Sequence, residues 1–168
     1  MQEADILTTV ARQYGAALDM LGQAIVLCPE ALWLAEGHKN RYWHIAYHTL
    51  FYTHFYLQPS EAAFQAWGKH RPDSQYLGGR PWAKVEMPKV EPPYPKEEVL
   101  EYYQFCRAEV QARVPGLELG APSGFHWLPF NKLEVQFYNI RHIQHHTAQL
   151  ADRLRAATET GVPWSIGK

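Results

Sequence analysis

The stretch from Tyr42 to Ser60 contains no Asp, Glu, Lys or Arg, although these four residue types make up 20% of the chain. A helix is predicted here from about Arg41 to Leu57, with Asn40 as its N-terminal cap and apolar side chains on nearly every side. Such a helix has to be covered by other helices or by lipid. Three histidines within the stretch argue against lipid, where polar groups are costly. The stretch therefore predicts a central, buried helix.

Three further segments have the three-four spacing of apolar residues that is typical of amphipathic helices. They run from about Ala4 to Leu27, from Lys96 to Val114 and from Lys132 to Ala157. Asn131 and Glu134 have the spacing of a capping box at the start of the last segment. Together the four segments predict an all-α protein with the architecture of a four-helix bundle.

Length and composition fit one domain over residues 1–168, because a chain of this size can bury a core without disulfides. The two cysteines, Cys28 and Cys106, form no Cys-x-x-Cys motif and are expected to be reduced. The N-terminus carries charges where a secretion signal needs an apolar run. A cytoplasmic protein with no membrane partner is therefore expected.

Charged residues are dispersed along the chain, and the formal net charge is -1. A nucleic-acid partner is not expected, because it would require a cluster of basic residues. The sequence also lacks the Glu-x-x-His pairs of di-iron bundles and the Gly-x-Ser-x-Gly motif of serine hydrolases. The aromatic-rich faces of the first two predicted helices suggest a homodimer.

The segment from Gln58 to Pro95 contains seven of the twelve prolines and fits neither a continuous helix nor a regular sheet. One helical turn is expected within it, around Glu61 to Trp67. A connection of this length inside a compact domain needs a structural reason. If the helices on either side run parallel, the chain between them has to cross the whole bundle.

Nine histidines occur in the chain, and His142 and His146 lie four residues apart in the last predicted helix. Residues at this spacing share a helix face, whereas His145 falls off that direction. Two imidazoles one turn apart can bind the same ion, as in zinc half-sites. Gln149 and Arg153 continue their stripe, and it borders an apolar stripe expected to comprise Phe137, Ile140, Ile143, Leu150 and Leu154. The alternative is that both histidines are partly exposed and bonded to water.

A third ligand would have to come from another helix, and the buried stretch offers His44 and His48 one turn apart. A neutral imidazole on an apolar helix face needs a polar partner. Either a metal ion or a hydrogen bond within the core would satisfy it. The residues alone favour neither histidine over the other.

The last predicted helix carries the pattern His-x-x-His-His-x-x-Gln from His142 to Gln149, which resembles the signature of the DinB/YfiT-like superfamily of metal-dependent proteins. The buried stretch is similar to the second helix of that family, with His48 followed by the aromatic cluster Phe55-Tyr56-Leu57. The resemblance spans essentially the whole chain. It implies a four-helix bundle in up-down-down-up order, with a long crossover between the second and third helices.

The resemblance further implies a three-histidine site for zinc, nickel or a similar divalent metal ion, with His48, His142 and His146 as its ligands. One departure from the family lies beside these positions. The family often has Arg-Gly before the final glutamine, whereas this chain has Thr147-Ala148. No role can rest on a basic residue there, and the ligand positions are unaffected.

Three neutral histidines leave at least one coordination position open, which is typical of catalytic zinc sites. Related proteins in the superfamily include transferases that use low-molecular-weight thiols of the bacillithiol or mycothiol type. The resemblance therefore implies that the ion holds a thiolate, which attacks an electrophilic small-molecule substrate. A metal-dependent hydrolase and a non-enzymatic metal-binding or stress-response protein are the alternatives.

Tyr52, Gln149 and Arg153 are the polar residues expected to contact a cofactor at this site, and each could equally serve as a structural hydrogen-bonding residue. No Asp or Glu near the ligands in sequence is an obvious general base, so no catalytic residue is assigned. His126, just before the last predicted helix, is the one further histidine that we expect could reach the site as a fourth ligand.

Overall fold

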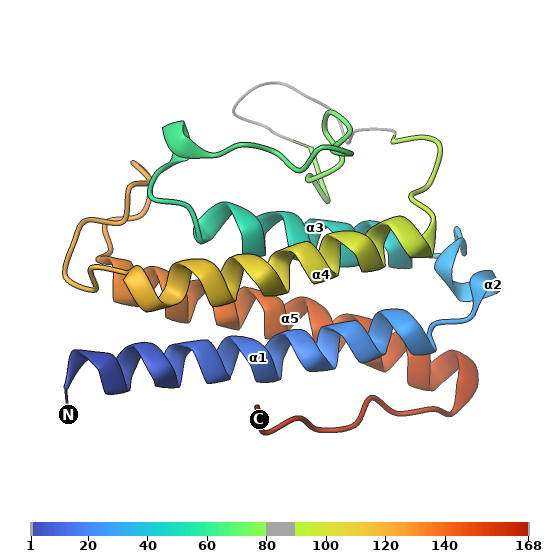
Figure 1. The fold of residues 1–168 in the computed structure, drawn as a ribbon. Coiled ribbons are helices and arrows are strands. Elements are labelled where there is room, and N and C mark those ends of the chain that lie inside the picture. The colour runs from blue at the N-terminus through green and yellow to red at the C-terminus, as the bar shows by residue number, and fades with distance from the viewer. Residues whose placement is uncertain (1, 80–89, 168) are drawn as a thin grey trace.

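The computed structural model describes residues 2–79 and 90–167, and its secondary structure within them is helical. The long helices lie side by side (Figure 1), and they are α1 (Glu3–Leu27), α3 (Tyr42–Tyr56), α4 (Lys96–Arg113) and α5 (Lys132–Thr158). Shorter elements connect them, namely α2 (Glu30–Trp33) and the 3-10 turns η1 (Glu61–Ala63) and η3 (Val114–Gly116). No strand occurs among the described residues, which contain one isolated bridge between Pro122 and Asn131.

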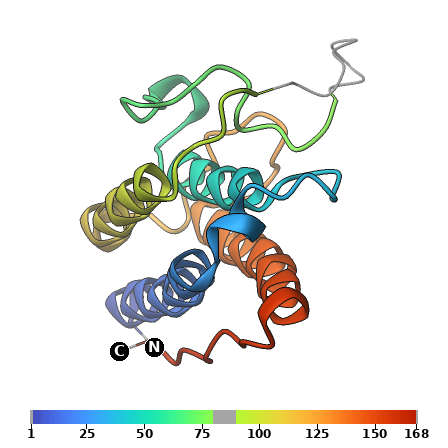
Figure 2. The same ribbon diagram turned by 90° about the vertical axis from the view of Figure 1, so that its right-hand side faces the viewer.

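The four long helices form a bundle in which α1 and α3 each pack against both α4 and α5. Viewed along the helices, α1 lies diagonally opposite α3, and α4 lies diagonally opposite α5 (Figure 2). The prediction of an all-helical bundle is therefore confirmed for the described part of the chain. Each long helix is found within two residues of its predicted ends.

The two predicted helix caps have different outcomes. The Asn131 side chain accepts a hydrogen bond of 2.9 Å from the backbone N–H of Glu134, as predicted for the start of α5. The prediction that Asn40 caps α3 is wrong, because α3 begins one residue later, with Arg41 in the N-cap position. The Asn40 carbonyl instead accepts a hydrogen bond of 2.7 Å from Arg153 on α5.

The short helix α2 was not predicted from the sequence. Its last residue, Trp33, is fully buried, and the indole N–H donates a 2.9 Å hydrogen bond to the carbonyl of Tyr94. A single helical turn has too few residues to show a period, so only the tertiary contact of Trp33 marks it.

The predicted central helix, α3, is the most buried element of the bundle. All of its residues are buried except His48 and Tyr52, which are partly exposed. These two side chains lie one turn apart and therefore share a helix face. Every other side of α3 is covered by the bundle or by the segment that follows it.

The buried face of α5 differs from the predicted apolar stripe. Phe137 was expected in the core but is 58% exposed, so this part of the prediction is wrong. The neighbouring residue Gln136 is fully buried instead, and its Oε1 accepts a 2.8 Å hydrogen bond from the Tyr14 hydroxyl of α1. Asn139, also buried, donates a 3.1 Å hydrogen bond to the carbonyl of Thr53 in α3. Two polar residues therefore occupy the core face because α1 and α3 supply their partners.

The segment between α3 and α4 is described at 57–79 and at 90–95, and the rest of the predicted Pro-rich connection lies outside the described residues. The expected helical turn is present as η1. The described part lies over α3 and α4 (Figure 1), where Trp67 stacks on Tyr102 of α4 at a ring-centroid distance of 4.5 Å. The segment thus forms a cover over the bundle.

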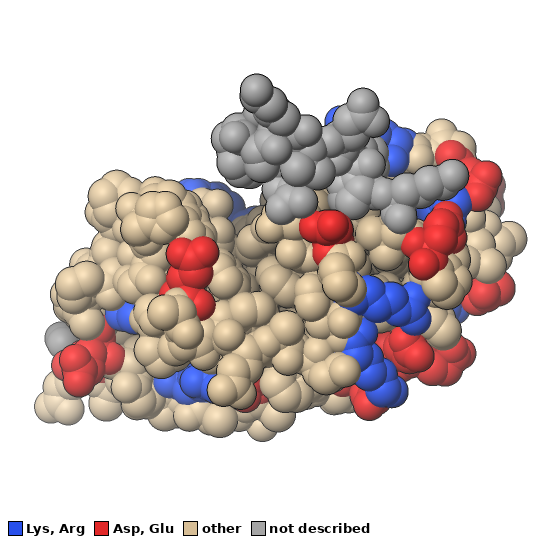
Figure 3. Space-filling view, turned by 90° about the horizontal axis from the view of Figure 1, so that it is seen from above, with Lys and Arg blue, Asp and Glu red and all other residues tan. Residues whose placement is uncertain are grey.

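The charged residues on the described surface and the two cysteines show no unusual grouping. On the described part of the face in Figure 3, basic and acidic residues are interspersed rather than separated by sign. Cys28 and Cys106 are buried and free, as predicted. None of the helices within the described residues combines the length and the apolar character that a membrane span requires.

Candidate metal centre

Three histidines from two helices converge at one point of the bundle. His48 of α3 and His142 and His146 of α5 each offer a ligand nitrogen, and these nitrogens all lie within 4.8 Å of one another. Two of these nitrogens, His48 Nε2 and His142 Nε2, are 3.1 Å apart. The group could hold a metal ion, and it is the set of residues that the sequence and the family resemblance indicated.

Local helix geometry and the packing of α3 on α5 explain the convergence. His142 and His146 lie one turn apart on α5, and their ring centroids are 4.6 Å apart. The His48 ring lies 5.0 Å from that of His142 and 4.7 Å from that of His146. α3 packs against α5, and His48 lies on the partly exposed face of α3. Its ring therefore meets the two histidines of α5 beside the buried core.

Hydrogen bonds to the outer nitrogens of two rings determine their tautomers. His48 Nδ1 lies 2.6 Å from the carbonyl oxygen of Gln75, and a carbonyl can only accept, so Nδ1 carries the proton. In the same way His146 Nδ1 donates to Gln149 Oε1 at 2.8 Å. Both rings therefore present the lone pair of Nε2 to the centre. This arrangement, with the second nitrogen bonded to an oxygen, is the usual one for metal-bound histidines.

The third ring, His142, is only partly satisfied by the described residues. Its Nδ1 is buried and has no hydrogen-bond partner among them. Because His48 Nε2 carries a lone pair, the 3.1 Å contact requires His142 Nε2 to carry a proton when no ion is bound. An ion that bonds to both Nε2 atoms would require the His142 proton to move to Nδ1, which keeps the ring neutral.

Burial keeps these imidazoles neutral. It lowers the pKa of His142 to about 3, with smaller contributions from His146 and His145. Burial also places the pKa of His48 well below its ordinary value, and the pKa of His146 is lowered for the same reason. A neutral imidazole is the form that binds a metal.

The residues at this centre fit a divalent transition metal. In tetrahedral geometry with metal–nitrogen bonds of about 2.0–2.1 Å, ligand nitrogens lie about 3.3–3.4 Å apart, so small side-chain shifts would bring all three into range. The donor set consists of nitrogen alone, and no carboxylate belongs to the group among the described residues. Imidazole ligands suit zinc, nickel, copper and iron better than magnesium or calcium.

Of the three other predicted site residues, two lie at the centre and one has a different partner. Tyr52 is brought to the centre, with its ring 4.8 Å from that of His48 and 5.6 Å from that of His142. Gln149 is also brought there, as the hydrogen-bond partner of His146. Arg153 donates to the Asn40 carbonyl, away from the ligand nitrogens, and its role in binding a cofactor stays a prediction.

The remaining histidine candidates are accounted for. His44 is buried, and its Nε2 bonds to the carbonyl of Ser74 at 2.9 Å, so it is a satisfied core histidine. His145 is exposed and bonds to Gln149 at 3.4 Å. The His126 side chain is 81% exposed and lies 3.4 Å from Glu61, so it does not close the centre as a fourth ligand.

Sequence reasoning missed Gln75, whose carbonyl orients His48. The contact is made by the backbone of the Pro-rich segment, 27 positions along the chain from His48. A backbone carbonyl is present at every residue, so no sequence signal could have singled it out.

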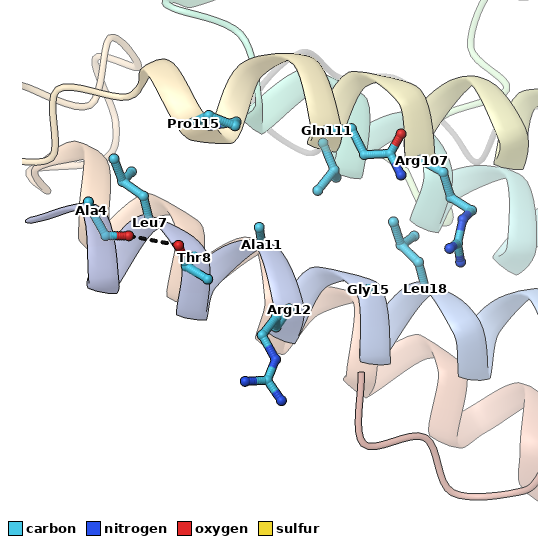
Figure 4. Close-up of a pocket in the computed structure, with 11 residues that line it drawn as sticks. Ala4, Leu7, Thr8, Ala11, Arg12, Gly15, Leu18, Arg107, Gln111 and Pro115 are labelled. Carbon is cyan, nitrogen blue, oxygen red and sulfur yellow. Dashed lines mark hydrogen bonds between the residues drawn. The ribbon is translucent and has the colours of Figure 1, made fainter. Parts of the chain in front are cut away.

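Two hollows on the molecule differ in their relation to this centre. A cavity of about 480 Å³ lies between α1 and α4 (Figure 4), where Leu7 and Ala11 point toward α4 and Arg12 points away. No histidine lines it. A shallower hollow of about 230 Å³ lies beside the centre and includes His142 in its wall. Only the second is placed to admit a ligand to the histidines.

Comparisons of the chain with models of protein families, with curated proteins and with solved structures found no match. The geometry of the centre and the residues that form it are therefore the observations that bear on function.

Proposed function

We propose that the protein binds one divalent metal ion through His48, His142 and His146. The observation that carries this proposal is the convergence of three neutral imidazoles, two of which have their outer nitrogens bonded to oxygen atoms. Zinc and nickel are the ions we propose, because both accept nitrogen ligands and suit a site without carboxylates. The short motifs at the ligands support membership in the DinB/YfiT-like superfamily.

The same proposal includes the helix order of that superfamily, up-down-down-up. In support, α1 is joined to α3 through the short α2 at one end of the bundle in Figure 1. The described part of the Pro-rich segment then runs back along the bundle before α4 begins. An antiparallel α3 and α4 would need only a short connection, so a long segment at this place favours a crossover.

The activity that we propose is transfer of a thiol to an electrophilic small molecule. A bound ion supplies Lewis acidity, which lowers the pKa of a coordinating thiol or water and makes it a nucleophile near neutral pH. In the thiol case the S–H proton is released to solvent, a sulfur–carbon bond forms, and the leaving group departs with its electron pair. His48, His142 and His146 would hold the ion, and Gln75 and Gln149 keep two of those rings oriented.

One observation favours the thiol proposal over metal-dependent hydrolysis. Many hydrolytic metal sites have a carboxylate as general base, and no Asp or Glu belongs to the histidine group within the described residues. Metal-dependent hydrolysis is therefore a secondary proposal. Non-enzymatic metal binding in a stress response is another, and the carboxylate observation does not bear on it.

Elemental analysis of protein purified without added metal tests the binding proposal. We expect about one ion per chain in the native protein and in His145→Ala, and loss of the ion in His48→Ala, His142→Ala and His146→Ala. His145→Ala is the matched control, because it removes an exposed histidine from the same turn of α5. Loss of metal from His145→Ala but not from His142→Ala would show that the proposal places the site on the wrong face of α5.

A cobalt-substituted sample tests the activity proposal. Cobalt reports changes of coordination in its visible spectrum, so a thiol that binds in an open position should alter the spectrum. A spectrum that does not respond to thiols would contradict the transferase proposal and leave metal binding itself standing.

A further inference from the structure

The shallow hollow beside the metal centre is built from one side of α5. Its wall consists of Tyr138, Arg141, His142 and His145. His142 belongs both to this hollow and to the three-histidine group. A molecule bound in the hollow would therefore lie against one of the proposed ligands.

Arg141 gives the hollow a positive charge that no acidic residue pairs with in the described part of the chain. It is exposed, and its guanidinium carbon lies 5.5 Å from the centroid of the Tyr138 ring, a cation–π distance. No acidic residue lines the hollow. Within 2–79 and 90–167, none of the ion pairs includes Arg141. The planar guanidinium, with its five donors, is thus available to a carboxylate or phosphate.

The proposed metal centre adds to this charge. Three neutral imidazoles do not neutralise a divalent ion, so the centre keeps a formal charge of about +2 when loaded. Arg141 is next to His142 in the chain and lines the same hollow, so a ligand bound there meets both charges. A negatively charged ligand is therefore favoured over a neutral or cationic one of the same shape.

Tyrosine rings connect the hollow to the centre and offer an apolar surface. The Tyr138 ring packs edge-on against Tyr56 at 5.3 Å, and Tyr56 lies 5.8 Å from Tyr52. Tyr52 in turn contacts the rings of His48 and His142. Tyr138 and Tyr52 are partly exposed, whereas Tyr56 between them is buried. A bound ligand can therefore meet aromatic carbon at Tyr138 in the hollow and at Tyr52 beside the histidines, which suits an apolar body.

From these contacts we infer that the protein takes a small organic anion, with a carboxylate bound by Arg141, an apolar body against the tyrosines and a donor atom at the metal. The inference rests on the proposed function for the ion. It assigns to Arg141 the selection of the substrate or thiol by charge.

The test uses the cobalt-loaded full chain and two probes that differ in one group, 3-mercaptopropionate and 3-mercaptopropionamide. Titration followed by the cobalt spectrum gives a dissociation constant for each. We expect the carboxylate probe to bind about fivefold more tightly, as for an exposed charge pair. The preference should decrease in Arg141→Gln to the part that the ion supplies, decrease less in Arg141→Lys and decline at high salt. Arg155→Gln is the matched control, an exposed arginine farther along α5, and it should keep the full preference.

The other possible results separate failure of this inference from failure of the proposed function. Equal affinity for the two probes in the native protein would overturn the inference alone. A preference that is as large in Arg141→Gln as in the native protein would show that the ion alone selects the carboxylate, and it would also overturn the inference. Failure of the native protein to take up cobalt would overturn the proposed function, and the inference with it. Uptake of cobalt by Arg141→Gln, with an unchanged helical signal, verifies that the variant is folded.

Discussion

His54 illustrates how single buried side chains on α3 couple stability to pH. The residue is 3% exposed, its Nδ1 lies 3.2 Å from the Tyr102 hydroxyl and its Nε2 lies 3.8 Å from Glu109. Burial lowers its pKa to about 4, although Glu109 acts in the opposite direction, and Arg113 adds to the lowering. The ring is therefore held in its neutral form by the fold, apart from any metal.

The first prediction follows from that shift. The folded pKa of His54 lies below the unfolded value, so between about pH 6.5 and 4 the unfolded chain binds a proton that the native state excludes. The free energy of unfolding should be fully retained above about pH 6.5 and fall toward pH 4, with a contribution from His54 on the order of 2–3 kcal/mol. Denaturant titrations at several pH values measure this slope, and His54→Gln should make it shallower.

The exposed residue His126 provides the control for this experiment, because its side chain is 81% exposed. His126→Gln should leave the slope as it is in the native protein. The same slope in His54→Gln and in the native protein would show that other groups, such as the buried His44, account for the whole effect.

At the scale of elements, the contact between α1 and α4 depends on a close approach at Gly22. A Cβ at this position would lie 2.6 Å from Cζ of Tyr103 on α4. The Tyr103 ring is buried, and its hydroxyl accepts a 3.0 Å hydrogen bond from Arg107, so it has little room to move. Gly15, on the same helix, has no atom within 4 Å of the corresponding position. The two glycines are thus a natural pair for comparison.

The second prediction uses this pair. Gly22→Ala should lower the free energy of unfolding by about 1 kcal/mol, because the cost of overpacking exceeds the gain in helix propensity. Gly15→Ala should raise it by about 0.5–1 kcal/mol, because alanine favours the helix and meets no obstacle. Urea titration of both variants measures the difference. A stabilised Gly22→Ala would mean that Tyr103 moves aside more readily than its contacts indicate.

At the scale of the whole molecule, the bundle has a core that does not depend on an ion. Buried apolar residues from all four long helices form one continuous cluster. The histidine centre lies on the partly exposed face of α3, beside this cluster rather than within it. Structural zinc domains differ in this respect, because they unfold without their metal.

The third prediction concerns removal of the metal. With a chelator, the helical circular dichroism signal should persist and unfolding should stay cooperative. The stabilisation by the ion should follow ordinary linkage, about 2.7 kcal/mol at a free metal concentration of 100 times Kd, which corresponds to roughly 5–10 °C in Tm. His142→Ala should show no shift with chelator. Collapse of the helical signal on chelation would give the ion a structural role.

The long helices were predictable from the sequence because their signal is local. Apolar residues repeat along each segment with the period of a helix, and each residue is close in the chain to those that share its face. The pairing of His142 with His146 was predictable for the same reason, since four-residue spacing places both on one side of α5. The resemblance to a family then pointed to His48.

The residues alone left His44 and His48 open, and the tertiary structure shows why only His48 belongs to the histidine group. Both lie on α3 one turn apart, and their roles diverge because Ser74 and the ligand nitrogens of α5 occupy different positions around that helix. Tertiary contacts likewise exposed Phe137 and buried Gln136, because Tyr14 of α1 supplies the partner that a buried amide requires. Periodicity specifies which residues share a face, but the register of one helix against another depends on contacts between residues far apart in the chain.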